Sequence, residues 1–100
     1  MSVYALIELN VVPEKFEEAG DIFSKAPRAT REWEGCNGVE VFSNQAESKY
    51  FFIESFDTEA QWKEYFEWRG QASGHILEAI LTEPLKVIFT QRHDFGYDPI

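Results

Sequence analysis

Four segments of the chain combine β-branched and aromatic residues with the two-residue alternation of a β-strand. They cover residues 3–9, 39–43, 49–56 and 85–92. In the third segment Tyr50, Phe52 and Phe56 alternate with Phe51 and Ile53, so both of its faces are apolar. Both faces of the first segment are mostly apolar too. Because a strand with one face in water carries polar residues there, we expect both strands to be covered on two sides.

The residues between the first two predicted strands show helical periodicity. Pro13 suits the first position of a helix, and apolar residues recur at helical spacing over residues 12–26. Pro27 interrupts this pattern, so residues 28–33 are expected to form a second helical segment or a bent continuation. Two glycines within residues 34–38 then predict a turn into the second strand.

A second helical region follows the third strand. Thr58 and Gln61 have the spacing of a capping box, which predicts a helix start. Gly70 predicts its end, because glycine is the commonest residue after a helix C-terminus. After a weakly patterned stretch, residues 75–81 are predicted to form another helix that Pro84 ends.

The resulting order is strand, helix, strand, strand, helix, strand, without repeats or linkers. It predicts one α+β domain over residues 1–100, a ferredoxin-like βαββαβ sandwich with a four-stranded antiparallel sheet. The core is expected over residues 3–92, with an irregular tail over 93–100. Helices cover one sheet face in such a fold, so the apolar second face would lie in water. We therefore expect a homodimer whose two sheets pack face to face.

Composition narrows the function classes. Among 100 residues, 18 are acidic and 9 basic, giving a formal net charge of −9. This charge repels phosphate backbones and anionic lipids, so neither nucleic acid nor membrane is an expected partner. The single cysteine, Cys36, cannot form an internal disulfide and belongs to no metal-ligand pattern. The N-terminus lacks the features of a signal peptide, which predicts a cytoplasmic protein.

Candidate chemistry gathers on the predicted helix that begins near Thr58. Trp62, Tyr65, Phe66 and Arg69 follow one another at helical spacing and share one face. Tyr65 and Arg69 could orient or polarise a substrate oxygen there. Alternatively, Trp62 and Phe66 belong to the core, and Arg69 is a surface residue near the helix C-terminus.

Two further residues could accept a proton. His75 has the intrinsic pKa of a base near neutral pH, and the alternative is an exposed histidine without a role. Glu54 is a carboxylate in an otherwise apolar strand, so it needs either a partner or a raised pKa. It could act as a base or form a salt bridge, for example with Arg92, and we favour the salt bridge.

The segments EGCNGVEVF and FFIESFDTEAQWKEYFEWR, taken with the order of elements, resemble the antibiotic biosynthesis monooxygenase-like family of dimeric α/β barrels. The resemblance extends over residues 3–92. It implies a dimer with an aromatic-lined pocket between the helices and the sheet of each subunit. Family members include cofactor-independent oxygenases of quinols and aromatic polyketides, and heme-degrading oxygenases.

The resemblance also suggests roles for single positions. Tyr65 lies where heme-degrading members carry a tryptophan, and His75 lies near their heme-ligating histidine. Ile7 replaces their catalytic asparagine, which argues against heme degradation. The Trp68-Arg69 pair looks like a motif of a quinol-monooxygenase-like branch.

We therefore predict a monooxygenase of a quinol or polycyclic aromatic that uses neither metal nor cofactor. The predicted catalytic residues are His75 and Tyr65. The predicted substrate-binding residues are Trp62, Arg69, Trp33, Phe52 and Trp68, although packing alone would also account for Trp33 and Trp68. The alternatives are a non-catalytic or stress-related module that binds a small ligand and, third, a heme-degrading oxygenase.

Overall fold

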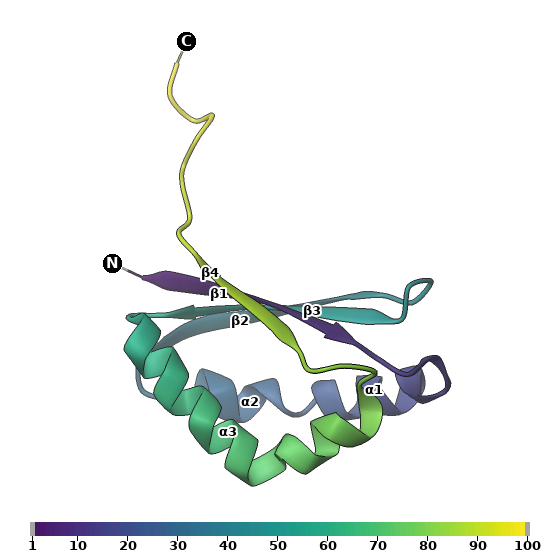
Figure 1. The fold of residues 1–100 in the computed structure, drawn as a ribbon. Helices are drawn as coiled ribbons and strands as arrows, with labels where there is room; N and C mark the ends of the chain where they lie inside the picture. The colour runs from purple at the N-terminus through teal and green to yellow at the C-terminus, as the bar shows by residue number, and fades with distance from the viewer. Residues whose placement is uncertain (1, 100) are drawn as a thin grey trace.

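One antiparallel sheet and one layer of helices make up the computed structural model of the chain, which describes residues 2–99 (Figure 1). The strands are β1 (Val3–Asn10), β2 (Cys36–Asn44), β3 (Lys49–Phe56) and β4 (Lys86–Thr90), in the spatial order β2-β3-β1-β4. The helical elements are η1 (Pro13–Lys15), α1 (Phe16–Phe23), α2 (Pro27–Arg31) and α3 (Glu59–Ile80). This is the predicted ferredoxin-like α+β arrangement.

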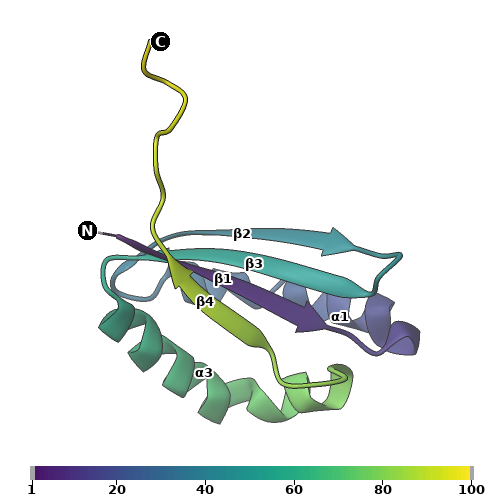
Figure 2. The ribbon, with the colours of Figure 1, turned by 45° about the horizontal axis from the view of Figure 1, so that its top comes forward.

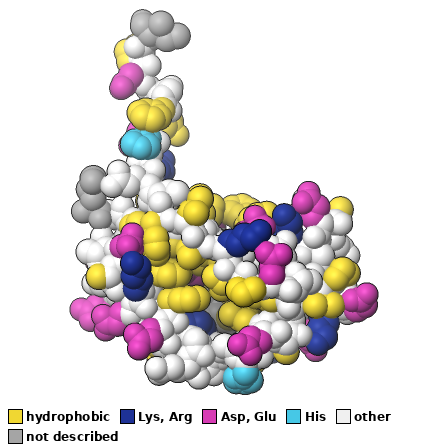
Figure 3. All heavy atoms as spheres, in the orientation of Figure 1, with side chains coloured by type: hydrophobic (Ala, Val, Ile, Leu, Met, Phe, Trp, Pro, Cys, Tyr) yellow, Lys and Arg dark blue, Asp and Glu magenta, His cyan; other side chains and the backbone are white. Residues whose placement is uncertain are grey.

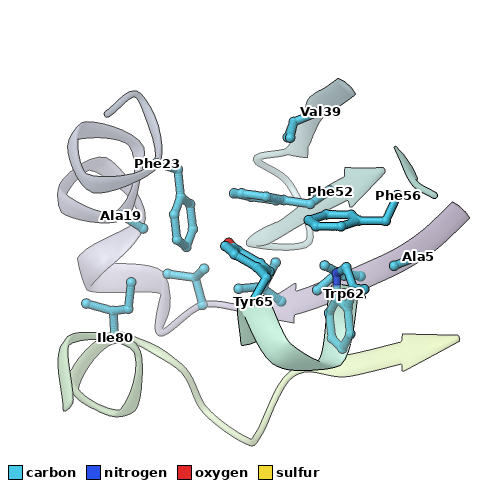
Figure 4. Packing of buried hydrophobic residues seen from close by; sticks show 12 residues of the cluster. Ala5, Ala19, Phe23, Val39, Phe52, Phe56, Trp62, Tyr65 and Ile80 are labelled. Carbon is cyan, nitrogen blue, oxygen red and sulfur yellow. The ribbon is translucent and has the colours of Figure 1, made fainter. Parts of the chain in front are cut away.

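The core lies between the sheet and the helices. Figure 4 shows Phe52 and Phe56 of β3 packed against Tyr65 and Trp62 of α3. The ring centroids of Phe56 and Tyr65 are 5.5 Å apart. Alternate residues of β1, among them Ile7, complete the floor of this core. The inner sheet face is therefore a continuous aromatic and aliphatic surface beneath the helices.

Pro27 separates the first two α-helices as predicted. α1 ends at Phe23, and Pro27 is the first residue of α2. A proline ring cannot donate the hydrogen bond of a helix interior, but it fits the first turn. The break directs the buried Thr30 of α2 toward α3.

The second helical region differs from the prediction. Thr58 caps it as expected, since its side chain accepts a hydrogen bond of 3.1 Å from the backbone N–H of Gln61. The predicted end at Gly70 and the separate helix over 75–81 are wrong, because α3 continues to Ile80. The helix bends midway, as Figures 1 and 2 show. Ser73 donates from Oγ to the carbonyl of Arg69 at 3.2 Å, a bond typical of bent helices.

Because α3 continues past Gly70, a substitution of this glycine by alanine should stabilise the protein. A Cβ added there meets no atom within 4 Å, so Gly70→Ala should raise the free energy of unfolding by about 0.5–1 kcal/mol. Gly35→Ala is the control expected to destabilise, because Gly35 has φ +94° and its added Cβ would lie 2.7 Å from Gln61. Urea unfolding measures both. Destabilisation by Gly70→Ala would instead indicate a helix that ends at this glycine.

The opposite face of the sheet also carries large apolar side chains, as predicted, beside the charged Glu8 and Lys86. Phe42 of β2 and Ile88 of β4 are 49% and 62% exposed. β4 ends at Thr90, and the chain beyond it is irregular and extends away from the domain (Figures 1 and 2). Within residues 2–99, no helix has the length and apolar character needed to cross a bilayer.

Candidate functional site

A cavity of about 430 Å³ lies between the helices and the inner face of the sheet. Its walls come from β1 and β3 on one side and from α1, α2 and α3 on the other, and most of its lining is apolar. Figure 3 shows hydrophobic side chains gathered between β4 and α3 on the visible face. The polar lining residues are few: Lys25, Thr30, Glu54, Tyr65, Arg69 and Ser73.

Tyr65, Thr30 and Arg69 form a connected polar group in the cavity wall. The hydroxyl groups of Tyr65 and Thr30 are 2.7 Å apart and share a hydrogen bond. Arg69 donates from Nε to the Tyr65 hydroxyl at 3.1 Å and from Nη2 to Thr30 Oγ1 at 3.0 Å. Burial raises the pKa of Tyr65, and the nearby Glu54 raises it further. Tyr65 therefore stays a neutral phenol at physiological pH.

Arg69 also connects α3 to the chain just before α2. Its Nη2 donates to the carbonyl oxygen of Ala26 at 2.9 Å, and its guanidinium lies 5.0 Å from the ring centroid of Trp68. The alternative role at a helix C-terminus does not hold, because α3 continues to Ile80. The guanidinium thus brings a fixed positive charge to a mostly apolar wall.

Glu54 is the buried carboxyl group of the cavity, with 3% of the residue exposed. Its Oε1 accepts a hydrogen bond of 2.8 Å from Nε1 of Trp62. The prediction of a salt bridge between Glu54 and Arg92 is wrong, because Nη1 of Arg92 pairs instead with Oδ1 of Asp94 at 2.7 Å. Burial raises the pKa of Glu54, while the hydrogen bond from Trp62 and the charge of Arg69 partly oppose this rise.

The predicted site residues divide into three groups. Tyr65, Arg69 and Phe52 line the cavity together. Trp62 lies outside the lining and donates a hydrogen bond to Glu54. Trp33 and Trp68 pack on each other with ring centroids 5.2 Å apart and lie beside Tyr65, outside the lining.

His75 lies on the exposed side of α3 and does not line the cavity. Its catalytic role remains a prediction that this position does not support. Thr30 was not predicted as a site residue, because a polar residue in a five-residue helix carries no periodic signal. Trp62 was likewise not predicted as the partner of Glu54, although the two are only eight residues apart.

The chain has a recognisable family. The model of the antibiotic biosynthesis monooxygenase family matches residues 2–75. This chain belongs to that family. The cavity described above is therefore the pocket of an antibiotic biosynthesis monooxygenase family member, a monooxygenase-like domain. No protein of curated function matches the sequence.

Solved structures of similar fold align over nearly the whole chain. The crystal structure of an antibiotic biosynthesis monooxygenase aligns with a TM-score of 0.78 and 14% identity, over 91% of this chain and 98% of that chain. A conserved protein from Methanosarcina mazei Go1 aligns with a TM-score of 0.79 and 15% identity, over 93% and 94%. A Mycobacterium tuberculosis protein aligns at 0.73 and 16%, over 96% and 99%. At these identities the likeness concerns the fold alone.

Proposed function

We propose that this protein is a monooxygenase that acts on a quinol or a polycyclic aromatic without a cofactor. The observation that carries the proposal is the cavity, in which aromatic and aliphatic walls surround a small group of polar side chains. Such walls suit a flat apolar substrate, and the polar group suits one substrate oxygen. Membership of the antibiotic biosynthesis monooxygenase family supports the same reaction class.

The proposed reaction takes its electrons from the substrate. An anthrone-type CH₂ group and O₂ give a ketone and water, and a hydroquinone and O₂ give a hydroxyquinone and water. In both cases one oxygen atom enters the product and the other leaves as water. The substrate must first lose a proton, because its anion is the species that donates electrons to O₂.

Tyr65 and Arg69 fit the task of stabilising that anion. The Tyr65 hydroxyl is oriented by Thr30 and Arg69, and the guanidinium adds a positive charge beside the largely apolar lining of the cavity. Charge in such surroundings acts more strongly than in water. We therefore assign the substrate oxygen to the side of the cavity that Tyr65 and Arg69 form.

An oxygen electrode tests the proposal directly. The purified protein, stripped of metal and checked by absorbance for bound chromophores, should consume O₂ with members of a panel of naphthohydroquinones and anthrones. Labelled ¹⁸O₂ should place one labelled atom in the product. Binding of the same compounds without any turnover would contradict the proposal and favour a non-catalytic binding module.

Heme does not fit the lining residues of this cavity. An axial ligand is normally His, Cys, Met or Tyr. The described lining contains only Tyr65 of these, and its hydroxyl is engaged with Thr30 and Arg69. A specific Soret shift on hemin titration that His75→Ala abolishes would restore the heme-degrading alternative.

We also propose that the protein works as a homodimer through the outer face of the sheet. This face forms a hollow of about 610 Å³ whose lining includes Phe42, Phe51, Ile53 and Ile88, together with the charged pair of Glu8 and Lys86. A second copy of the same face would cover these side chains, in agreement with the face-to-face packing predicted from the sequence.

A charge on the outer face should therefore weaken the dimer. Ile88→Lys is expected to raise the dimer dissociation constant on the order of 100-fold, because a symmetric interface would bury two added ammonium groups close to Lys86, which is already positively charged. Sedimentation velocity measures the change. Ala60→Lys, on an exposed position of α3, is the control expected to leave the dimer intact. A monomeric wild-type protein at micromolar concentration would contradict the proposal.

A further inference from the structure

We propose that Glu54 is the catalytic base of this site, the group that removes the acidic proton of the bound aromatic substrate. The proposal rests on the proposed oxygenase function and adds the proton acceptor that it requires. The base predicted from the sequence, His75, lies outside the cavity lining. Among the lining residues, Glu54 is the one carboxyl group.

The two oxygens of the Glu54 carboxyl group have different surroundings. Oε1 is anchored by the indole N–H of Trp62 at 2.8 Å. No second hydrogen bond or salt bridge to Glu54 is found within residues 2–99, yet no fully buried side-chain oxygen or nitrogen there lacks a partner. Oε2 must therefore be accessible, and the accessible space beside Glu54 is the cavity. One oxygen is fixed, and the other is available to a ligand.

The neighbours of Glu54 suit a base. From α3, Trp62 donates a hydrogen bond to the carboxylate, and the positive charge of Arg69 favours the ionised form. Burial raises the pKa of Tyr65 on α3 and of Cys36 on β2, and the charge of Glu54 raises both further, so these two groups remain protonated. Burial raises the pKa of Glu54 above its usual value of 4.5. Carboxylates raised in this way accept protons more strongly than exposed ones.

Each proton that the substrate loses in the proposed reaction passes to a named acceptor. The substrate transfers one proton from its acidic C–H or O–H group to Oε2, which leaves a substrate anion beside Tyr65 and Arg69 and a neutral Glu54. The anion then transfers electrons to O₂ and forms the new C–O bond. The proton on Glu54 and the second substrate hydrogen both leave with the other oxygen atom as water, so the carboxylate is regenerated.

Glu54→Gln is the test, because the amide keeps the size of the side chain and can still accept from Trp62 but cannot take a proton. We expect kcat to fall on the order of 100-fold or more, the usual contribution of a general base, with little change in KM. Calorimetry with the anthrone or naphthohydroquinone substrates checks that binding survives. The matched control is Glu64→Gln, on an exposed part of α3, which should keep full turnover.

Substrate acidity separates a base from a merely structural residue. The loss in Glu54→Gln should shrink along a series of increasingly acidic anthrones, because a substrate that is already ionised needs no base. Full turnover in Glu54→Gln, or a loss that is the same for every member of the series, would overturn the proposal. An inactive wild-type protein would instead contradict the oxygenase function itself.

Trp62→Phe provides a second variant. It removes the anchoring N–H and keeps an aromatic ring, which disfavours the ionised form of Glu54. As Trp62 is a positioning residue, we expect the acidic limb of the pH profile of kcat to move to higher pH while turnover at high pH partly survives. Tyr97→Phe, on the exposed C-terminal tail, also removes a polar group and keeps an aromatic ring, and it should leave the profile in place. An unshifted profile in Trp62→Phe would contradict the assignment.

Discussion

Replacement of Arg69 by methionine is expected to lower both the stability and the activity of the protein. The guanidinium donates to Tyr65, Thr30 and the carbonyl of Ala26, and methionine keeps most of the apolar stem while removing all three bonds. We expect the free energy of unfolding to fall by about 2–4 kcal/mol, because bonds to a charged donor are stronger than neutral ones. Turnover should fall on the order of 100-fold with the loss of the fixed charge.

Arg69→Lys separates the two effects. Lysine restores the positive charge, but its single ammonium group cannot reproduce the planar arrangement of the guanidinium donors. We expect it to recover part of the turnover and less of the stability. Urea unfolding and oxygen uptake, the latter under conditions where circular dichroism finds each variant folded, measure both. Wild-type stability and rate in Arg69→Met would contradict the role given to this network.

Glu54→Gln is expected to be more stable than the wild-type protein at neutral pH and similar to it in acid. Burial raises the pKa of Glu54 in the folded state above its value of 4.5 in the unfolded chain. The contribution of this group to the stability of the wild-type protein is therefore fully present below pH 4.5. It is lost as the pH rises through the pKa of the folded state. Glutamine has no charge to bury, so it escapes this loss.

The measurement is the difference in unfolding free energy between Glu54→Gln and wild type from about pH 4 to pH 8. The difference should grow with pH and then level off, at about 1.4 kcal/mol for each unit by which the folded state raises the pKa. Glu64→Gln serves as the control, with no such trend expected for an exposed carboxylate. A difference that falls with rising pH would mean that the folded protein favours ionised Glu54.

The two expectations for Glu54 support each other. A buried carboxylate that destabilises the fold at neutral pH is hard to explain as a packing device, because glutamine or a hydrophobic residue would serve better. Proteins tolerate such costs mainly at functional sites. A variant that gains stability and loses turnover would be the expected result for a catalytic group.

Much of the fold could be predicted from local pattern alone. The alternation of β1 and β3, the proline that separates α1 from α2, and the cap at Thr58 are each determined by neighbours within a few residues. The end of α3 was not predicted correctly, because Gly70 is compatible both with a helix interior and with a helix end. The propensity difference is about 1 kcal/mol, which tertiary packing readily overrides.

The candidate site was only partly predictable. Helical spacing placed Tyr65 and Arg69 on one face of a helix, and the apolar surroundings marked Glu54 as unusual. The choice of partner for Glu54 was wrong, since a buried carboxylate can be satisfied by an ion pair or by an indole N–H, and only the packing of α3 on β3 decides between them.

The sequence by itself determined the order of the elements, the two apolar sheet faces and the chemically capable side chains, because periodicity and residue type are local properties. Only the tertiary structure brought Thr30 of α2 to Tyr65 and Arg69 of α3, and left His75 on the outside. It also anchored Glu54 on Trp62 beside the cavity. Such contacts depend on how separate elements pack against one another, and the spacing of residues within one segment does not specify this packing.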